Sequence, residues 1–125
     1  MMMMARGMIV VDENLLQLVT PLRSLNIHVV TPESGWNDKK IAETLLVNRI
    51  FVTCNSKDFV HYAAGLSIGI IGLEGLDFTD AEQDGSKNIT VQIISKAIIK
   101  HKIWSKKNGF FLELKENGKH KFQEF

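Results

Sequence analysis

Short apolar runs that alternate with segments of helical periodicity are the feature that most constrains this chain. The runs are rich in β-branched residues and are bounded by polar or turn-forming residues. Runs of this length and composition are typical of strands buried on both faces of a sheet. They lie at residues 8–11, 27–30, 50–53 and 66–71. Because buried strands that alternate with helices form parallel sheets covered on both faces, the sequence predicts a three-layer α/β domain with a mostly parallel central sheet.

The segments between these runs carry apolar residues at the three- and four-residue spacing of one helix face. We expect helices at residues 14–22, 37–46, 55–64 and 88–100. Asn14 is a candidate N-cap of the first helix, and Asn37 or Asp38 of the second, since such side chains accept hydrogen bonds from the first helical turn. Pro21 lies inside the first pattern and predicts a kink or a break there.

The end of the chain has the pattern of a β-hairpin. Residues 110–114 alternate, 116–118 is a Glu-Asn-Gly turn signal, and 119–125 is the returning strand. We expect this hairpin either as an antiparallel edge of the sheet or as a small protruding arm. The length of 125 residues fits one domain, expected over 8–125, with 1–7 as an unstructured start or a cloning feature.

Charge and cysteine usage exclude several classes of protein. The formal net charge is +1, so no overall field attracts nucleic acid, and any such site has to be a local basic patch. Cys54 is the only cysteine, which excludes an intramolecular disulfide and a cysteine zinc site. We therefore expect a reducing, cytoplasmic location. No apolar run approaches the roughly 20 residues that span a bilayer, so no membrane partner is expected.

Three aspartates follow the predicted strands. Asp12 ends the first strand, Asp38 lies at the start of the helix after the second, and Asp58 follows the third. Because ligands of open parallel sheets bind beyond the carboxyl ends of the strands, these carboxylates are expected to converge on one edge. Converging carboxylates repel one another unless a cation neutralises them, and Mg²⁺ or Mn²⁺ takes oxygen ligands. Each aspartate alone also has a structural explanation, as a turn residue, an N-cap or a first-turn acid.

Three segments resemble the motifs of PIN-domain nucleases. Asp38-Lys-Lys-Ile-Ala42 is similar to the family's Asp-x-x-Ile-Ala helix, and Thr53-Cys-Asn-Ser-Lys-Asp-Phe59 is similar to its Thr-x-Asn-x-x-Asp-Phe segment. Met8-Ile-Val-Val-Asp12 is similar to the family's first strand with its metal-binding aspartate. The Asp-Glu-Asn at the end of this strand most resembles the short PIN-like subfamily. The resemblance covers residues 8–71.

The resemblance implies a metal-dependent endoribonuclease that hydrolyses RNA phosphodiesters. Relatives of this kind are often the toxin of a toxin–antitoxin pair, so a cognate antitoxin protein is an implied partner. The resemblance assigns Mg²⁺ or Mn²⁺ to Asp12, Asp38 and Asp58, which would be both the metal ligands and the catalytic residues. Thr53 would orient a carboxylate by hydrogen bonding, and Asn55 would hold the loop or contact a ligand.

One departure from the family keeps other interpretations open. Full-length members carry a further glutamate on a helical insertion, and the segment between Asp12 and Asp38 is too short for that element. Glu13 or Glu33 would have to substitute, and neither matches residue by residue. The alternative is a non-catalytic PIN-like module that binds RNA or a protein. A receiver-like domain is a third interpretation, disfavoured because Thr53-Cys54-Asn55 replaces the aspartate expected after the third strand.

A basic stretch with one aromatic residue follows the last predicted helix. Lysines neutralise phosphates and tryptophan stacks on unpaired bases, so the stretch favours RNA binding, although solvated helix ends are commoner. Its members are Lys100, Lys102, Trp104, Lys106 and Lys107. His101 and His120 lie in lysine-rich segments and are expected to be solvated. Isoleucines on more than one face of the 88–100 helix predict deep burial or a homodimer contact.

Overall fold

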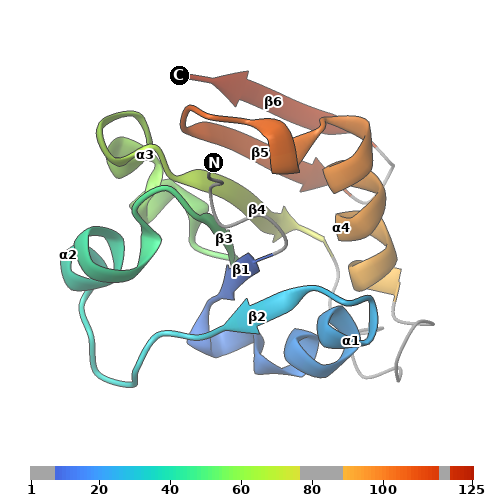
Figure 1. Ribbon diagram of the computed structural model, residues 1–125, viewed down its shortest axis with the longest axis horizontal. Coiled ribbons are helices and arrows are strands. Elements are labelled where there is room, and N and C mark those ends of the chain that lie inside the picture. Colours follow the sequence, from blue (N-terminus) through green and yellow to red (C-terminus); the bar gives the residue numbers. More distant parts are fainter. Residues whose placement is uncertain (1–7, 77–88, 116–118) are drawn as a thin grey trace.

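A six-stranded sheet organises the chain, of which the computed structural model describes residues 8–76, 89–115 and 119–125. The strands are β1 (Met8–Val11), β2 (His28–Val30), β3 (Ile50–Thr53), β4 (Gly69–Gly75), β5 (Phe110–Lys115) and β6 (His120–Glu124). They lie in the order β2-β1-β3-β4-β5-β6. Strands β1 to β5 are parallel to their neighbours, and β6 is antiparallel to β5 (Figure 1). The mostly parallel sheet is therefore confirmed, and the hairpin is an edge of that sheet rather than a protruding arm.

Helical segments cover both faces of the sheet. The α-helices are α1 (Val19–Ser24), α2 (Asp38–Ile41), α3 (Val60–Leu66) and α4 (Ile89–Lys100). The described residues also form short 3-10 segments and one π-helical turn: η1 (Glu13–Leu18), η3 (Ser56–Asp58), η6 (Ile103–Ser105) and the π-helical η2 (Ala42–Leu46). Figure 1 shows α2 and α3 on one side of the molecule, and α1 and α4 on the other.

Successive residues of the central strands point to opposite faces, and each face has its own core. Ile9 and Val11 of β1 belong to the core formed with η1, α1 and α4. Val10 belongs to the core formed with α2, η2 and α3. Ile50 and Phe51 of β3 divide between the two cores in the same way. Burial on both faces explains why these strands are continuous apolar runs, and it gives the chain its helix–sheet–helix layering.

The fourth strand lies later in the chain than the sequence predicts. Leu66 is the last residue of α3, and Ser67 ends that helix in the left-handed conformation, with φ of 53°. The strand is Gly69–Gly75 rather than 66–71. The apolar run crosses a helix end, a turn and a strand, and its composition does not mark the boundaries between them. The shift matters because it brings Glu74 into the strand.

The first helical segment begins at Glu13, so Asp12 rather than Asn14 occupies its N-cap position. The side chain of Asp12 makes no capping hydrogen bond. The segment is a 3-10 helix as far as Leu18, and Pro21 lies in the first turn of α1. A proline costs little there, because the first N–H groups of a helix have no intrahelical partner. The predicted irregularity therefore falls just before the proline.

The other helical predictions are close to the structure. Asn37 caps α2, as expected, and its side chain accepts a hydrogen bond from the backbone N–H of Lys40 at 2.8 Å. The expectations for 1–7 and for the turn at 116–118 lie outside the described residues. No helix in the described ranges is long and apolar enough to cross a membrane.

Candidate functional site

A buried hydrogen-bond chain fixes Asp12 where β1 meets η1. The backbone N–H of Asp12 continues the sheet by donating to the carbonyl of Val52 at 3.0 Å. The hydroxyl of Thr53 donates to Oδ2 of Asp12 at 2.6 Å and accepts from the backbone N–H of Asn55 at 2.9 Å. Thr53 is fully buried and Asp12 is only 7% exposed. Because the hydroxyl has one proton, accepting from Asn55 leaves that proton directed at the carboxylate.

A second carboxylate is held at the end of β4. Oε2 of Glu74 accepts from both the backbone N–H and the hydroxyl of Ser56, at 2.9 and 2.6 Å. Ser56 is buried, with 1% of its surface exposed. Gly72 allows this contact, since a Cβ at that position would lie 2.6 Å from Oγ of Ser56. The two donors leave the Glu74 carboxylate fixed against the loop that follows β3.

Cys54 follows Thr53, and its thiol is affected by both carboxylates. Burial first, then the negative charge of Glu74 and then that of Asp12, together raise the pKa of this thiol to about 11. The thiol is therefore protonated at neutral pH, which argues against a role as a nucleophile. Its perturbation also shows that Asp12 and Glu74 act on one small region.

Asp38 and Asp58 occupy more open positions. Asp38 is the first residue of α2, and Asp58 is the last residue of η3; both side chains are exposed. Across the described ranges, no three His, Cys, Asp or Glu side chains are grouped closely enough to hold one metal ion. The structure therefore associates Asp12 with Glu74 through Cys54, and it does not gather Asp12, Asp38 and Asp58 into a ready three-ligand cluster. Glu13, the neighbour of Asp12, is exposed.

Glu74 is the residue that the sequence analysis missed. The rule that found the aspartates, namely a polar residue at the carboxyl end of a parallel strand, applies equally to β4. It did not point to Glu74 because the strand was expected to end at Ile71, four residues before its observed end at Gly75. A boundary after Gly75 would have placed Glu74 beside the other candidates.

The two fixed carboxylates suit a hard divalent cation. Each uses one oxygen for the contacts above, and no hydrogen bond to Oδ1 of Asp12 or Oε1 of Glu74 is found within the described part of the chain. Glu74 is exposed, whereas Asp12 is buried. Mg²⁺ is commonly held by one or two carboxylates with several waters retained. Each of these carboxylates therefore offers an oxygen of the kind that Mg²⁺ takes.

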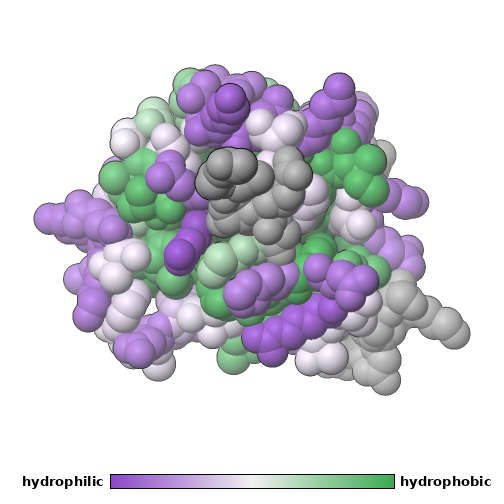
Figure 2. Space-filling model, viewed as in Figure 1, coloured by the Kyte–Doolittle hydropathy of each residue, from purple (hydrophilic) through white to green (hydrophobic). Residues whose placement is uncertain are grey.

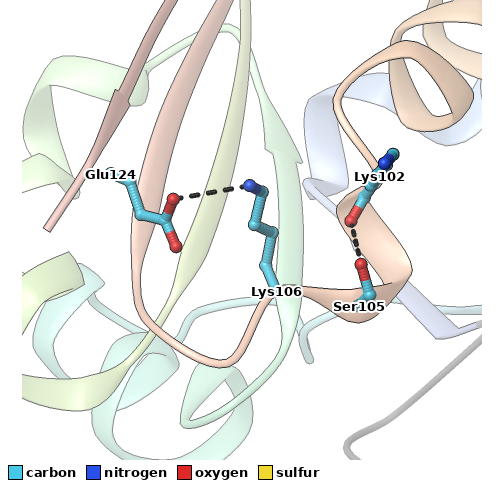
Figure 3. Close-up of polar contacts among 4 residues, drawn as sticks. All are labelled: Lys102, Ser105, Lys106 and Glu124. Carbon is cyan, nitrogen blue, oxygen red and sulfur yellow. Dashed lines mark hydrogen bonds and ion pairs between the residues drawn. The ribbon is translucent and has the colours of Figure 1, made fainter.

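The predicted basic stretch is partly engaged in local contacts. Nζ of Lys106 lies 3.4 Å from Oε1 of Glu124 and 5.2 Å from the ring centre of Phe122. Lys102 adopts the left-handed conformation, with φ of 52°, and its carbonyl accepts a hydrogen bond from the Ser105 hydroxyl at 2.9 Å (Figure 3). These contacts fix the turn between α4 and β5.

The remaining members of the stretch differ in exposure. Trp104 is half-buried and packs against the larger core, so only part of its ring is open for stacking. Lys100 and Lys107 are exposed. Hydrophilic side chains gather over β6 and the C-terminal end of α4 at the top of the view (Figure 2). The expectation that His101 and His120 are solvated is wrong, since Nε2 of His101 lies 3.0 Å from Nδ1 of His120 and both are half-buried.

Comparison of the chain with protein-family models, with curated proteins and with solved structures gives no match. The resemblance to PIN-domain nucleases therefore rests on the sequence motifs alone.

Proposed function

We propose that this chain is a Mg²⁺- or Mn²⁺-dependent endoribonuclease of the PIN type, with the ion held by Asp12 and Glu74. The observation that carries the proposal is the buried Asp12 carboxylate, which is oriented by the Thr53 hydroxyl at the carboxyl end of β1. An aspartate that served only to end the strand would be expected to cap η1, and Asp12 makes no such bond. Asp12 and Thr53 are also the positions at which the resemblance assigns a metal ligand and its orienting group.

The remaining acids have a subsidiary part in this proposal. Asp38 and Asp58 follow β2 and β3 in the chain and are exposed. We assign them to contacts with the ion through its waters, or with the RNA, because Mg²⁺ keeps several waters when protein ligands are few. Asn55 supports the site through its backbone N–H, which fixes the Thr53 hydroxyl.

The chemistry divides between the ion and the chain. A divalent ion bound there supplies an activated water and neutralises charge that develops on the phosphodiester. Thr53 keeps Asp12 in one orientation, and Ser56 does the same for Glu74. Preorganised ligands of this kind lower the cost of reorganising the site during the reaction.

A second candidate function is favoured by a specific observation. The described residues contain no group of three potential metal ligands. From the resemblance we expect a catalytic PIN-type site to have such a group. A non-catalytic PIN-like module that binds RNA or a protein would need no such cluster. The role of toxin, with a cognate antitoxin as partner, belongs only to the catalytic proposal.

Calorimetric titration with Mn²⁺, followed by incubation with a mixed RNA pool, tests the proposal. We compare the wild type with Asp12→Asn and Glu74→Gln, which keep the shape of each side chain. Glu43→Gln is the matched control, because Glu43 is an exposed acid on η2. Thermal unfolding of each variant shows that any loss does not come from misfolding.

The proposal expects both site variants to lose Mn²⁺ binding and RNA cleavage together, with the control unchanged. Metal binding without cleavage in the wild type would favour the non-catalytic module. Cleavage that persists in Asp12→Asn and Glu74→Gln would overturn the assignment of the site. Absence of Mn²⁺ binding in the wild type would remove the metal-dependent mechanism.

A further inference from the structure

A cavity of about 380 Å³ lies between α4 and the C-terminal hairpin. Its volume is within the range of small-molecule sites in proteins. Two lysines, one histidine and one aliphatic residue line it: Ile93, Lys96, Lys100 and His120. Three of these four side chains are basic and none is acidic. The lining therefore suits an anion.

The hairpin register decides which charges face this cavity. His120 is paired with Leu114, and Phe122 with Leu112, so both lie on the face of the sheet that packs against α4. Glu113 is paired with Lys121 on the opposite face. Both charges of that pair therefore point away from the cavity.

One carboxylate shares the α4 face of β6, and it is already engaged. Glu124 lies on the same side of the strand as His120, and its Oε1 is 3.4 Å from Nζ of Lys106. This is the only ion pair found in the described ranges. Lys96 and Lys100 therefore have no carboxylate partner among the residues described.

His101 holds His120 at the mouth of the cavity. The ring of His101 stacks on Phe122, with centres 4.9 Å apart and planes 12° apart, and its Nε2 is 3.0 Å from Nδ1 of His120. In this contact one imidazole donates and the other accepts, so at least one of the two nitrogens is unprotonated. Burial lowers the pKa of both histidines, and Lys100 lowers each further. An anion bound beside these two imidazoles would raise their pKa values and so oppose the effect of the lysines.

We propose that this cavity is a phosphate-binding site, in which Lys96 and Lys100 supply charge, His120 supplies a hydrogen bond and Ile93 forms an apolar wall. The site does not depend on the metal site, since it uses none of its residues. A cation would be repelled by the lysines, even though two imidazole nitrogens 3.0 Å apart are also a spacing that adjacent metal ligands adopt. Because an added negative charge favours imidazolium, a bound phosphate should raise the pKa of the histidine pair.

The position of the cavity suggests where the phosphate comes from. Gly75 of β4 is paired with Lys115 of β5, and Leu114 beside it is paired with His120 of β6. The cavity therefore lies at the same end of the strands as Glu74, two strands away across the sheet. Glu74 itself points to the opposite face of the sheet, since its neighbour Leu73 packs in the core with α4. If the proposed function holds, a phosphate of the RNA backbone at some distance from the cleaved one would occupy the cavity.

NMR titration of the full chain with inorganic phosphate, in a phosphate-free starting buffer without metal, tests the site. The signals to follow are the imidazole nitrogens of His101 and His120. The variants are Lys96→Gln with Lys100→Gln, and separately His120→Gln. Lys39→Gln is the control, because Lys39 is an exposed lysine on α2. Adenosine monophosphate and a short oligouridylate, titrated in the same way, distinguish a free phosphate ester from an RNA backbone.

The proposal expects saturable shifts of both histidines, and at least about tenfold weaker binding in the double lysine variant. His120→Gln should weaken binding less, and Lys39→Gln should leave it unchanged. Tighter binding of the oligouridylate than of the mononucleotide would assign the site to RNA, and equal binding to a free phosphate ester. Absence of saturable shifts, equal binding by the double variant, or binding of Zn²⁺ in preference to phosphate would overturn it.

Discussion

The acidic ends of β1 and β4 and the basic hairpin lie at the same end of the sheet, where the parallel strands have their carboxyl ends. They hold their polar groups in different ways. Each carboxylate oxygen used at the acidic end is fixed by a buried donor, Thr53 for Asp12 and Ser56 for Glu74. At the hairpin, two imidazoles hold each other, and the nearby lysines are exposed. The comparison indicates that buried donors hold each carboxylate in one position, because water is excluded there. At the hairpin, where water has access, the charge of the imidazoles can still change.

Thr53→Val should produce the largest effect, because it removes the link between two strands at the acidic end. The substitution leaves the buried Asp12 without its donor and the Asn55 N–H without its acceptor. We expect the free energy of unfolding in urea to fall by about 2–3 kcal/mol. Thr44→Val, an exposed position on η2, should change it by less than about 0.5 kcal/mol. Equal losses in both variants would mean that the buried chain contributes nothing of its own.

Gly72→Ala tests the second carboxylate through packing. An added Cβ would lie 2.6 Å from Oγ of Ser56 and 2.9 Å from Oε1 of Glu74, so both partners of the Ser56–Glu74 contact would have to shift. We expect a loss of about 1–3 kcal/mol in the free energy of unfolding, the usual cost of overpacking, together with weaker Mn²⁺ binding.

Gly65→Ala is the matched glycine substitution. Gly65 lies in α3, and nothing would lie within 4 Å of its added Cβ. The change should stabilise the protein by up to about 1 kcal/mol, since alanine is the better helix former. If Gly72→Ala and Gly65→Ala changed the free energy of unfolding in the same direction, the packing argument for Gly72 would be wrong.

Cys54 offers a smaller but more direct report on the acidic end. With its pKa raised to about 11, its thiolate fraction at pH 8 is about a hundredfold below that of an ordinary thiol. Removing a negative charge lowers the pKa, so Glu74→Gln and Asp12→Asn should each move the pH profile of iodoacetamide alkylation to lower pH. Glu43→Gln should leave it in place. If none of these variants moved the pH profile, the two carboxylates would not act on the Cys54 thiol.

The sequence predicts the acidic end better than the hairpin, for physical reasons. Asp12 and Thr53 end two neighbouring parallel strands, and strand order alone brings such positions together. Glu74 was missed because an apolar run that crosses a helix end hides where β4 stops. The contact between His101 and His120 depends on how the hairpin packs against α4, and no local pattern reports that packing.

The pH dependence of stability tests the hairpin and should be the smallest effect. The pKa values of His101 and His120 are both lowered in the folded protein, by burial first and then by neighbouring positive charges. The unfolded chain therefore binds protons more readily than the folded chain. The contribution is fully present above the ordinary histidine pKa of about 6.5 and is lost as pH falls through the lower folded values.

The urea midpoint in phosphate-free buffer should accordingly decrease between about pH 7.5 and about pH 5.5. His120→Gln should flatten this decrease, because the remaining imidazole no longer faces a second one that competes for the proton. His28→Gln removes an exposed imidazole from β2, on the other edge of the sheet, and should leave the slope as it is. Inorganic phosphate added at the lower pH should restore part of the loss only if the charge it neutralises is that of the histidine pair. A slope that is the same in all three proteins would show that the imidazole contact contributes nothing to stability, and the hairpin would then be held by its apolar side chains alone.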